Sequence, residues 1–296
     1  MITLATHRPR SILRRMLALG TFMLPITMPL SGAFAYTFTT IDVPGAAFTE
    51  ATGINRAGQI VGLYSAGGTQ HAYLLSNGTF TTIDPPGSVF AQALGIDNAG
   101  RVVGAFQTVI GQSHGFLRSP TGAFKTIDVP GASGTMAQGI NGGAGIVGTS
   151  HPTGGPCCPA DGFLRDDQTG AFIAIDVPGA AATQAEGING CGLIVGSWTP
   201  GVGSHAFIWA AGIIASFDFP GANGTTAHGV NHRGKVVGAY TLGGSSHGYL
   251  LDEGTFTTID VPGATQTVIL GINDLDEVVG FFIDTTGALH GFKATP

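Results

Sequence analysis

Short runs of alternating apolar and polar residues recur along the chain, separated by turns rich in glycine, proline and asparagine. In the first unit, residues 37–41 are rich in β-branched side chains and end before a proline, which cannot donate to a neighbouring strand. Residues 50–55, 59–64 and 71–75 have the same strand-like pattern. The turn Asn-Arg-Ala-Gly at 55–58 suits a hairpin. We therefore predict four antiparallel strands per unit.

The unit repeats six times. Each copy carries the phrase Ile-Asp-Val-Pro-Gly-Ala or a variant, and the successive aspartates lie 42, 44, 48, 42 and 42 residues apart. They are Asp42, Asp84, Asp128, Asp176, Asp218 and Asp260. Four strands in each of six copies, without a helical pattern, predict an all-β fold: a six-bladed β-propeller of four-stranded antiparallel blades. The chain opens with a lone strand and ends after three, so we expect the N-terminal strand to pair in the last blade and close the ring.

Residues 1–35 resemble a bacterial secretory signal peptide. Arg8, Arg10, Arg14 and Arg15 precede an apolar run, and Ala33-Phe34-Ala35 suits a cleavage site. The run is short and broken by two prolines, and no other stretch is long enough to span a membrane. We predict a secreted protein, extracellular or periplasmic, in which residues 36–296 form one propeller domain.

Removing the leader makes the chain strongly acidic. It then holds 8 basic and 18 acidic residues, so its formal charge is 8 − 18 = −10. No basic patch is left, which argues against nucleic acid as a partner. A hydrophobic fraction of 43% and 49 glycines over the whole chain indicate a packed, turn-rich β protein rather than a disordered one.

Several polar residues recur with the repeat. A histidine begins the triplet His-Gly/Ala-Phe/Tyr in five copies, and Asp161 replaces it in the third. We interpret each histidine and repeat aspartate as a hydrogen-bonded scaffold pair, the alternative being sixfold metal or catalytic chemistry. We expect Asp161 to lie opposite Asp128 without this partner. The asparagine of each Gly-Ile-Asn is explained by bonds to its own turn. The glycine after each Val-Val is expected to permit close packing or a bulge in the second strand.

The triplets His205-Ala206-Phe207 and His71-Ala72-Tyr73, with the string Gly-Ile-Asn-x-x-Gly-x-Ile/Val-Val-Gly, give the chain a family resemblance. It resembles the bacterial extracellular HAF-repeat proteins over essentially all of residues 36–296. That resemblance implies export and a repeat fold, and it supplies no catalytic residues.

The third copy is the longest, and its extra residues lie between the second and third strands. His151, Cys157, Cys158 and Asp161 there are candidate ligands for zinc or copper. The alternatives are a disulfide between the adjacent cysteines or a bridge to another chain. Cys191 falls on the opposite rim, where we expect it to be free and packed. The acidic turn at residues 273–277 offers oxygen ligands for calcium. The alternative is an ordinary solvated turn.

The innermost strand of each blade carries the second departure from the repeat. Two positions flanking its central alanine vary between copies, and their period of two places them on one face. In copies three to five they include Gln138, Gln184, Glu186 and His228, which predicts a polar sector opposite an apolar one. Glu186 and His228 are the acid–base candidates for catalysis. Gln138, Gln184, Glu50 and Gln92 are the candidate ligand-binding residues, and an ordinary wet channel lining is the alternative.

The predicted function is a secreted binding or interaction module, whose ligand we expect on the rim that carries the Ile-Asp-Val-Pro-Gly loops and the Cys157-Cys158 insertion. The expected partner is an extracellular glycan, polymer or protein, and the expected state is a monomer. One alternative is a secreted hydrolase or lyase acting on a polysaccharide or other polymer. Another is a structural repeat protein of the envelope or biofilm.

Overall fold

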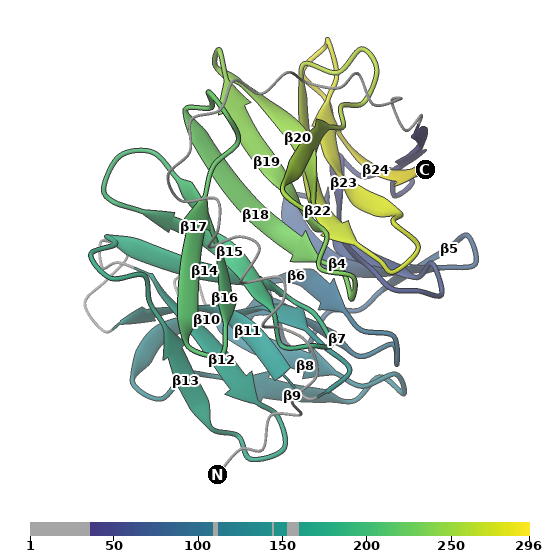
Figure 1. Ribbon diagram of the computed structural model, residues 1–296. Coiled ribbons are helices and arrows are strands. Elements are labelled where there is room, and N and C mark those ends of the chain that lie inside the picture. Colours follow the sequence, from purple (N-terminus) through teal and green to yellow (C-terminus); the bar gives the residue numbers. More distant parts are fainter. Residues whose placement is uncertain (1–35, 109–111, 144, 153–159) are drawn as a thin grey trace.

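The computed structural model describes residues 36–108, 112–143, 145–152 and 160–296, which form six four-stranded antiparallel sheets around one axis (Figure 1). We number these sheets as blades in chain order. From the innermost to the outermost strand they are β2 (Phe48–Ile54), β3 (Ile60–Ala66), β4 (Thr69–Ser76) and β5 (Thr79–Thr82) in blade 1; β6 (Phe90–Ile96), β7 (Val102–Gln107), β8 (His114–Arg118) and β9 (Phe124–Ile127) in blade 2; β10 (Ala132–Ile140), β11 (Gly145–Pro152), β12 (Asp161–Asp166) and β13 (Phe172–Ile175) in blade 3; β14 (Ala182–Ile188), β15 (Ile194–Thr199), β16 (His205–Ala210) and β17 (Ile213–Phe217) in blade 4; β18 (Gly224–Val230), β19 (Val236–Leu242), β20 (Ser245–Asp252) and β21 (Thr255–Thr258) in blade 5; and β22 (Gln266–Ile272), β23 (Val278–Ile283), β24 (Leu289–Thr295) and β1 (Thr37–Ile41) in blade 6.

The ring closes as the sequence predicts. β1 pairs antiparallel with β24, with Thr37 opposite Thr295 and Ile41 opposite Gly291. Figure 1 shows this purple N-terminal strand beside the yellow C-terminal one. Each inner strand contacts the inner strand of the next blade, and β22 contacts β2. The two ends of the folded chain are therefore joined by a strand ladder.

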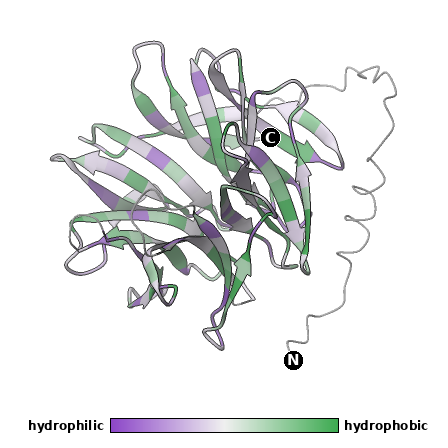
Figure 2. Ribbon diagram, turned by 90° about the vertical axis from the view of Figure 1, so that its left-hand side faces the viewer, coloured by the Kyte–Doolittle hydropathy of each residue, from purple (hydrophilic) through white to green (hydrophobic). Residues whose placement is uncertain are grey.

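The hydrophobic core lies between the blades. Six clusters of buried side chains each combine residues from two neighbouring blades. Between blades 1 and 2, for example, Val61 and Ala72 belong to the same cluster as Ala93, Val102 and Phe116. In Figure 2 the hydrophobic residues, coloured green, lie mainly in the strands. Because each blade buries its apolar faces on its neighbours, the ring must be complete for every blade to be covered.

The glycine after each Val-Val allows the inner two strands to pack closely. A Cβ atom on Gly62 would lie 1.9 Å from the Glu50 carbonyl oxygen and 2.8 Å from the Tyr73 ring. The close-packing prediction is confirmed. The bulge lies elsewhere: the register shifts in the inner strand, as between Ala51 and Gly53 in blade 1.

The repeated Pro-Gly loop is fastened to the inner strand that follows it. Val43 donates its backbone N–H to the Thr49 hydroxyl at 3.0 Å, and four other copies make the same bond. The second copy lacks both partners: Pro85 has no N–H, and Ala91 stands where the others have threonine. The donor and the acceptor have been lost together.

Five histidine–aspartate pairs form within single blades, at 2.7–3.0 Å from Nδ1 to carboxylate oxygen. Each histidine also lies against an aromatic side chain of the second strand, as His71 does against Tyr64. The predicted pairs are confirmed. Their carboxylates are partly exposed, so each pair is worth no more than about 1 kcal/mol.

Blade 3 differs from the other five. Where the other blades have a histidine and an aspartate, blade 3 has Asp161 and Asp176. Asp128 belongs to the pair of blade 2, where it binds His114. The expectation that Asp161 would face Asp128 is therefore wrong: the aspartate that follows the outer strand of the same blade is the partner. Burial, and then the charge of Asp161, raise the pKa of Asp176. Ser150 also replaces the aromatic residue opposite this position.

Candidate binding site at the channel mouth

Three adjoining cavities follow the axis of the ring, between the inner strands. We call the one near the Pro-Gly loops the IDVPG-side mouth; it measures about 170 Å³. The one at the far ends of the inner strands, beside the Gly-Ile-Asn turns, is the Asn-side mouth and measures about 220 Å³. A narrower space of about 80 Å³ shares lining residues with both. The two mouths have different chemistry.

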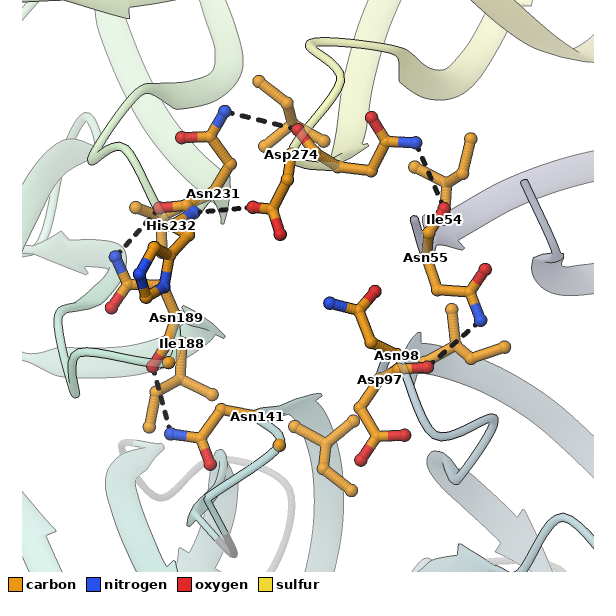
Figure 3. A pocket seen from close by; sticks show the side chains of 17 residues that line it. Ile54, Asn55, Asp97, Asn98, Asn141, Ile188, Asn189, Asn231, His232 and Asp274 are labelled. Carbon is orange, nitrogen blue, oxygen red and sulfur yellow. Dashed lines mark hydrogen bonds between the residues drawn. The ribbon is translucent and has the colours of Figure 1, made fainter. Parts of the chain in front are cut away.

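A ring of hydrogen bonds surrounds the Asn-side mouth, and Figure 3 shows the bonds that the asparagine side chains make in it. In five blades the asparagine side chain donates from Nδ2 to the backbone oxygen of the corresponding residue in the next blade, at 2.9–3.2 Å. The last of these bonds runs from Asn273 to Asn55. Each Oδ1 accepts from backbone N–H groups of its own turn, as in Asn189 with Cys191 and Leu193. The prediction that these residues serve only their own turns is incomplete.

Blade 2 completes the ring by a different route. Asp97 occupies the asparagine position and has no side-chain N–H to donate. Arg101 donates from Nε to Asp97 Oδ2 at 2.7 Å and from Nη2 to the Asn141 carbonyl at 3.0 Å. A guanidinium thus replaces the missing amide, and the ring bond to blade 3 is kept.

The IDVPG-side mouth has a polar half formed by blades 3, 4 and 5. Gln138, Glu186 and His228 line it from three successive inner strands. Thr149 donates to Gln138 Oε1 at 2.5 Å, and Ser197 donates to Glu186 Oε1 at 2.9 Å. Both hydroxyl residues are buried in the second strand, at 3% and 5% exposure. We call Gln138, Glu186 and His228 the polar arc.

The carboxylate and imidazole of the arc are bonded to each other. His228 Nδ1 lies 2.5 Å from Glu186 Oε2, and the two side chains are 16% and 13% exposed. His228 Nε2 lies 3.0 Å from the Thr226 hydroxyl. The predicted acid–base couple is therefore brought together, with its orientation fixed from both sides. Such an arrangement can bind a polar group or hold a proton at a defined atom.

Blades 6, 1 and 2 form the opposite, apolar half. Leu270, Leu63 and Leu94 line it, together with Thr52. Thr52 points its hydroxyl at backbone oxygens of Val61 and Ala93. The predicted contrast between a polar and an apolar sector is present.

Glu50 and Gln92 add polar ends to this apolar half. Within the described chain, neither side chain has a hydrogen-bond partner, and the Glu50 carboxylate forms no ion pair. Burial raises the pKa of Glu50. No lysine or arginine of the described chain lines the cavity. Gln184, the remaining binding candidate, is exposed outside the cavity wall and lies 3.5 Å from Ser197.

The candidate metal ligands are only partly described. Cys157 and Cys158 lie outside the described residues. His151 is half-buried, and its buried Nδ1 has no partner within the described chain. No three histidine, cysteine or acidic side chains of the described residues are grouped so as to hold a metal. The zinc or copper site stays a prediction.

The calcium candidate at residues 273–277 has other contacts. Arg233 and Lys235 bind the Asp276 carboxylate at 3.0 and 3.2 Å, and Lys293 binds Glu277 at 2.7 Å. Cations already occupy these oxygens, which disfavours calcium there.

Cys191 lies on the Asn-side rim. It is exposed rather than packed, because it follows Asn189 in the surface turn and its Sγ lies 3.9 Å from His232 Nδ1. The expectation of a packed thiol is wrong.

Comparisons with known proteins identify the fold. No protein-family model and no curated protein match this chain. It is similar to the solved structure of a putative TolB from Agrobacterium tumefaciens, with a TM-score of 0.59, 14% identity, and coverage of 84% of this chain and 90% of the other. It is also similar to a putative gluconolactonase, with a TM-score of 0.53, 10% identity, and coverage of 88% of this chain and 92% of the other. A third similar structure is the β-propeller domain of the Trilobed protease from Pyrococcus furiosus, with a TM-score of 0.50, 12% identity, and coverage of 83% of this chain and 94% of the other.

These likenesses and the six four-stranded sheets define the class of protein, a six-bladed β-propeller, and at such low identity the likenesses carry the fold alone. The resemblance to HAF-repeat proteins stays a prediction. Among the described residues, none forms a helix that could traverse a bilayer.

Proposed function

We propose that this chain is an exported propeller that binds a small, hydroxyl-rich ligand at the IDVPG-side mouth, such as the end residue of a glycan or related polymer. The observation that supports this is the polar arc, whose members Gln138, Glu186 and His228 are each held by a hydroxyl group. The opposite leucines suit the C–H face of a sugar ring. Export is part of the proposal, since the leader lies outside the described residues.

The size of the cavity favours a single small residue. Its volume of about 170 Å³ is below the roughly 300–1,000 Å³ of pockets for drug-sized ligands. It opens on the rim that carries the Pro-Gly loops, so a longer polymer can extend into solvent beyond the bound end. The fixed amide of Gln138 and the remaining lone pairs of Glu186 offer both donors and acceptors to hydroxyl groups.

The test is a glycan and polymer array with the protein from residue 36 onward, followed by calorimetry on the best ligand. Glu186→Gln and Gln138→Leu should each weaken binding at least about tenfold, a loss of about 1.4 kcal/mol. Asp274→Asn, a matched charge removal at the Asn-side mouth, should leave affinity unchanged. Binding that survives both arc substitutions would contradict this location.

The short Glu186–His228 contact supports a second candidate, a hydrolase or lyase acting on an extracellular polymer, with these residues as acid and base. The assay is product formation from any array ligand. Under this candidate, Glu186→Gln lowers turnover at least about a hundredfold while binding changes far less. Binding without product in the unaltered protein would reject it.

A further inference from the structure

The ionic balance of the IDVPG-side mouth points to a more specific ligand, an inference that rests on the proposed function. We infer that the bound residue carries a single ammonium group, as an amino sugar does, and that this group meets Glu50 while hydroxyl groups meet the polar arc.

The first argument is charge. Two carboxylates line the cavity, from Glu50 and Glu186. Glu186 is already paired with the imidazole of His228 and also accepts from Ser197. Glu50 has no corresponding partner among the described residues. Within the described chain, Glu50 is thus the carboxylate left without a hydrogen-bond partner, and in a cavity without lysine or arginine it attracts a cation and repels a carboxylate or sulfate ligand.

The second argument is position. Glu50 belongs to blade 1 and Glu186 to blade 4, which are opposite one another in a ring of six. A ligand that spans the mouth thus meets an unpaired carboxylate at one end and an oriented carboxylate, amide and imidazole at the other. The leucines near Glu50 lower the local dielectric, which strengthens a charge pair there. The formal charge of −10 on residues 36–296 further favours the approach of cations.

The experiment compares three ligands of one shape: D-glucosamine, D-glucose and D-glucuronate, with the same trio in the galactose series. Binding is measured by calorimetry and ligand-observed NMR at a pH where the amine is protonated and Glu50 is ionised. We expect the amino sugar to bind about tenfold more tightly than the neutral sugar, and the acid more weakly than both.

The variants separate the two proposals. Glu50→Gln should abolish the preference for the amino sugar, bringing its affinity to within about twofold of the affinity for the neutral sugar. Asp274→Asn removes one negative charge from the opposite mouth and should change neither. Equal binding of amino and neutral sugars, tighter binding of the acid, or a preference that survives Glu50→Gln overturns the inference but leaves the sugar site intact. If neither these sugars nor any array glycan binds, both proposals fail.

Discussion

The two mouths of the channel use their polar groups in opposite ways. At the Asn-side mouth nearly every blade presents the same side chain, and its amide is bonded both to its own turn and to the next blade. At the IDVPG-side mouth the residues differ from blade to blade, and Glu50 and Gln92 have no partner in the described chain. Repetition marks polar groups that hold the ring together. Variation marks groups left available to a ligand.

Substitution of one ring asparagine should have the largest effect on stability. Asn189→Ala removes the donor to the Asn231 carbonyl and the acceptor for two turn N–H groups at a position only 5% exposed. We expect a loss of about 3 kcal/mol in the free energy of unfolding, measured with urea. Gln138→Ala at the other mouth is the matched comparison and should cost less than about 1 kcal/mol. Equal losses would remove the distinction between the mouths.

The arrangement of blade 2 can be transferred to blade 1. Asn55→Asp places a carboxylate oxygen against the Asp97 carbonyl and should destabilise the protein by about 2 kcal/mol. Adding Gln59→Arg supplies a guanidinium at the position of Arg101 and should recover at least half of that loss. A double-mutant cycle in urea measures the coupling. No recovery would mean that Arg101 does not act as the substitute donor.

Blade 3 offers a smaller gain. Asp161→His should restore the pair seen in the other five blades and raise the free energy of unfolding by about 1 kcal/mol. Asp161→Asn, which only removes a charge, should give less. NMR titration should show the pKa of Asp176 falling in the histidine variant. If the two variants are equally stable, charge removal alone explains the gain.

The smallest expected effect concerns Glu50 and depends on pH. Because burial raises its pKa above the ordinary 4.5, the protonated form is favoured in the folded state. The stability that Glu50 contributes is fully present at pH values below its ordinary pKa and is lost as the pH rises through the raised pKa. Glu50→Gln should therefore stabilise the protein by no more than about 1 kcal/mol near neutral pH, and the gain should vanish in acid. Urea unfolding at several pH values measures this, and a pH-independent gain would contradict it.

Much of the fold could be predicted from the repeat. The lone strand at 37–41 and its pairing in the last blade are confirmed, and the predicted inner and third strands fall within a few residues of β2 and β4. Alternation and turn residues are local signals, and ring closure follows from counting strands. The polar arc could also be predicted from the sequence, because period-two spacing fixes which inner-strand residues share a face.

The contacts between blades were harder to foresee. Gln184 shares a face with Glu186 and has the same strand position as Glu50 and Gln92, yet it does not line the cavity, because alternation fixes the face of a residue and not the direction of its side chain. The asparagine ring joins residues about 42 positions apart, and the turn around each asparagine gives no local sign of that bond. The sequence does carry one sign of this ring. The second copy has Asp97 where the other copies have asparagine, and it has Arg101 four residues later.

Every donor of the asparagine ring points from one blade to the next along the chain, and the sixth bond returns to the first blade. One copy therefore carries the donor for its successor and the acceptor for its predecessor. Duplicating a complete copy adds both in equal number, so an ancestral gene can lengthen by whole units without leaving a buried group unpaired. Even the exception obeys this rule, because Asp97 and its compensating Arg101 are inherited together within one copy.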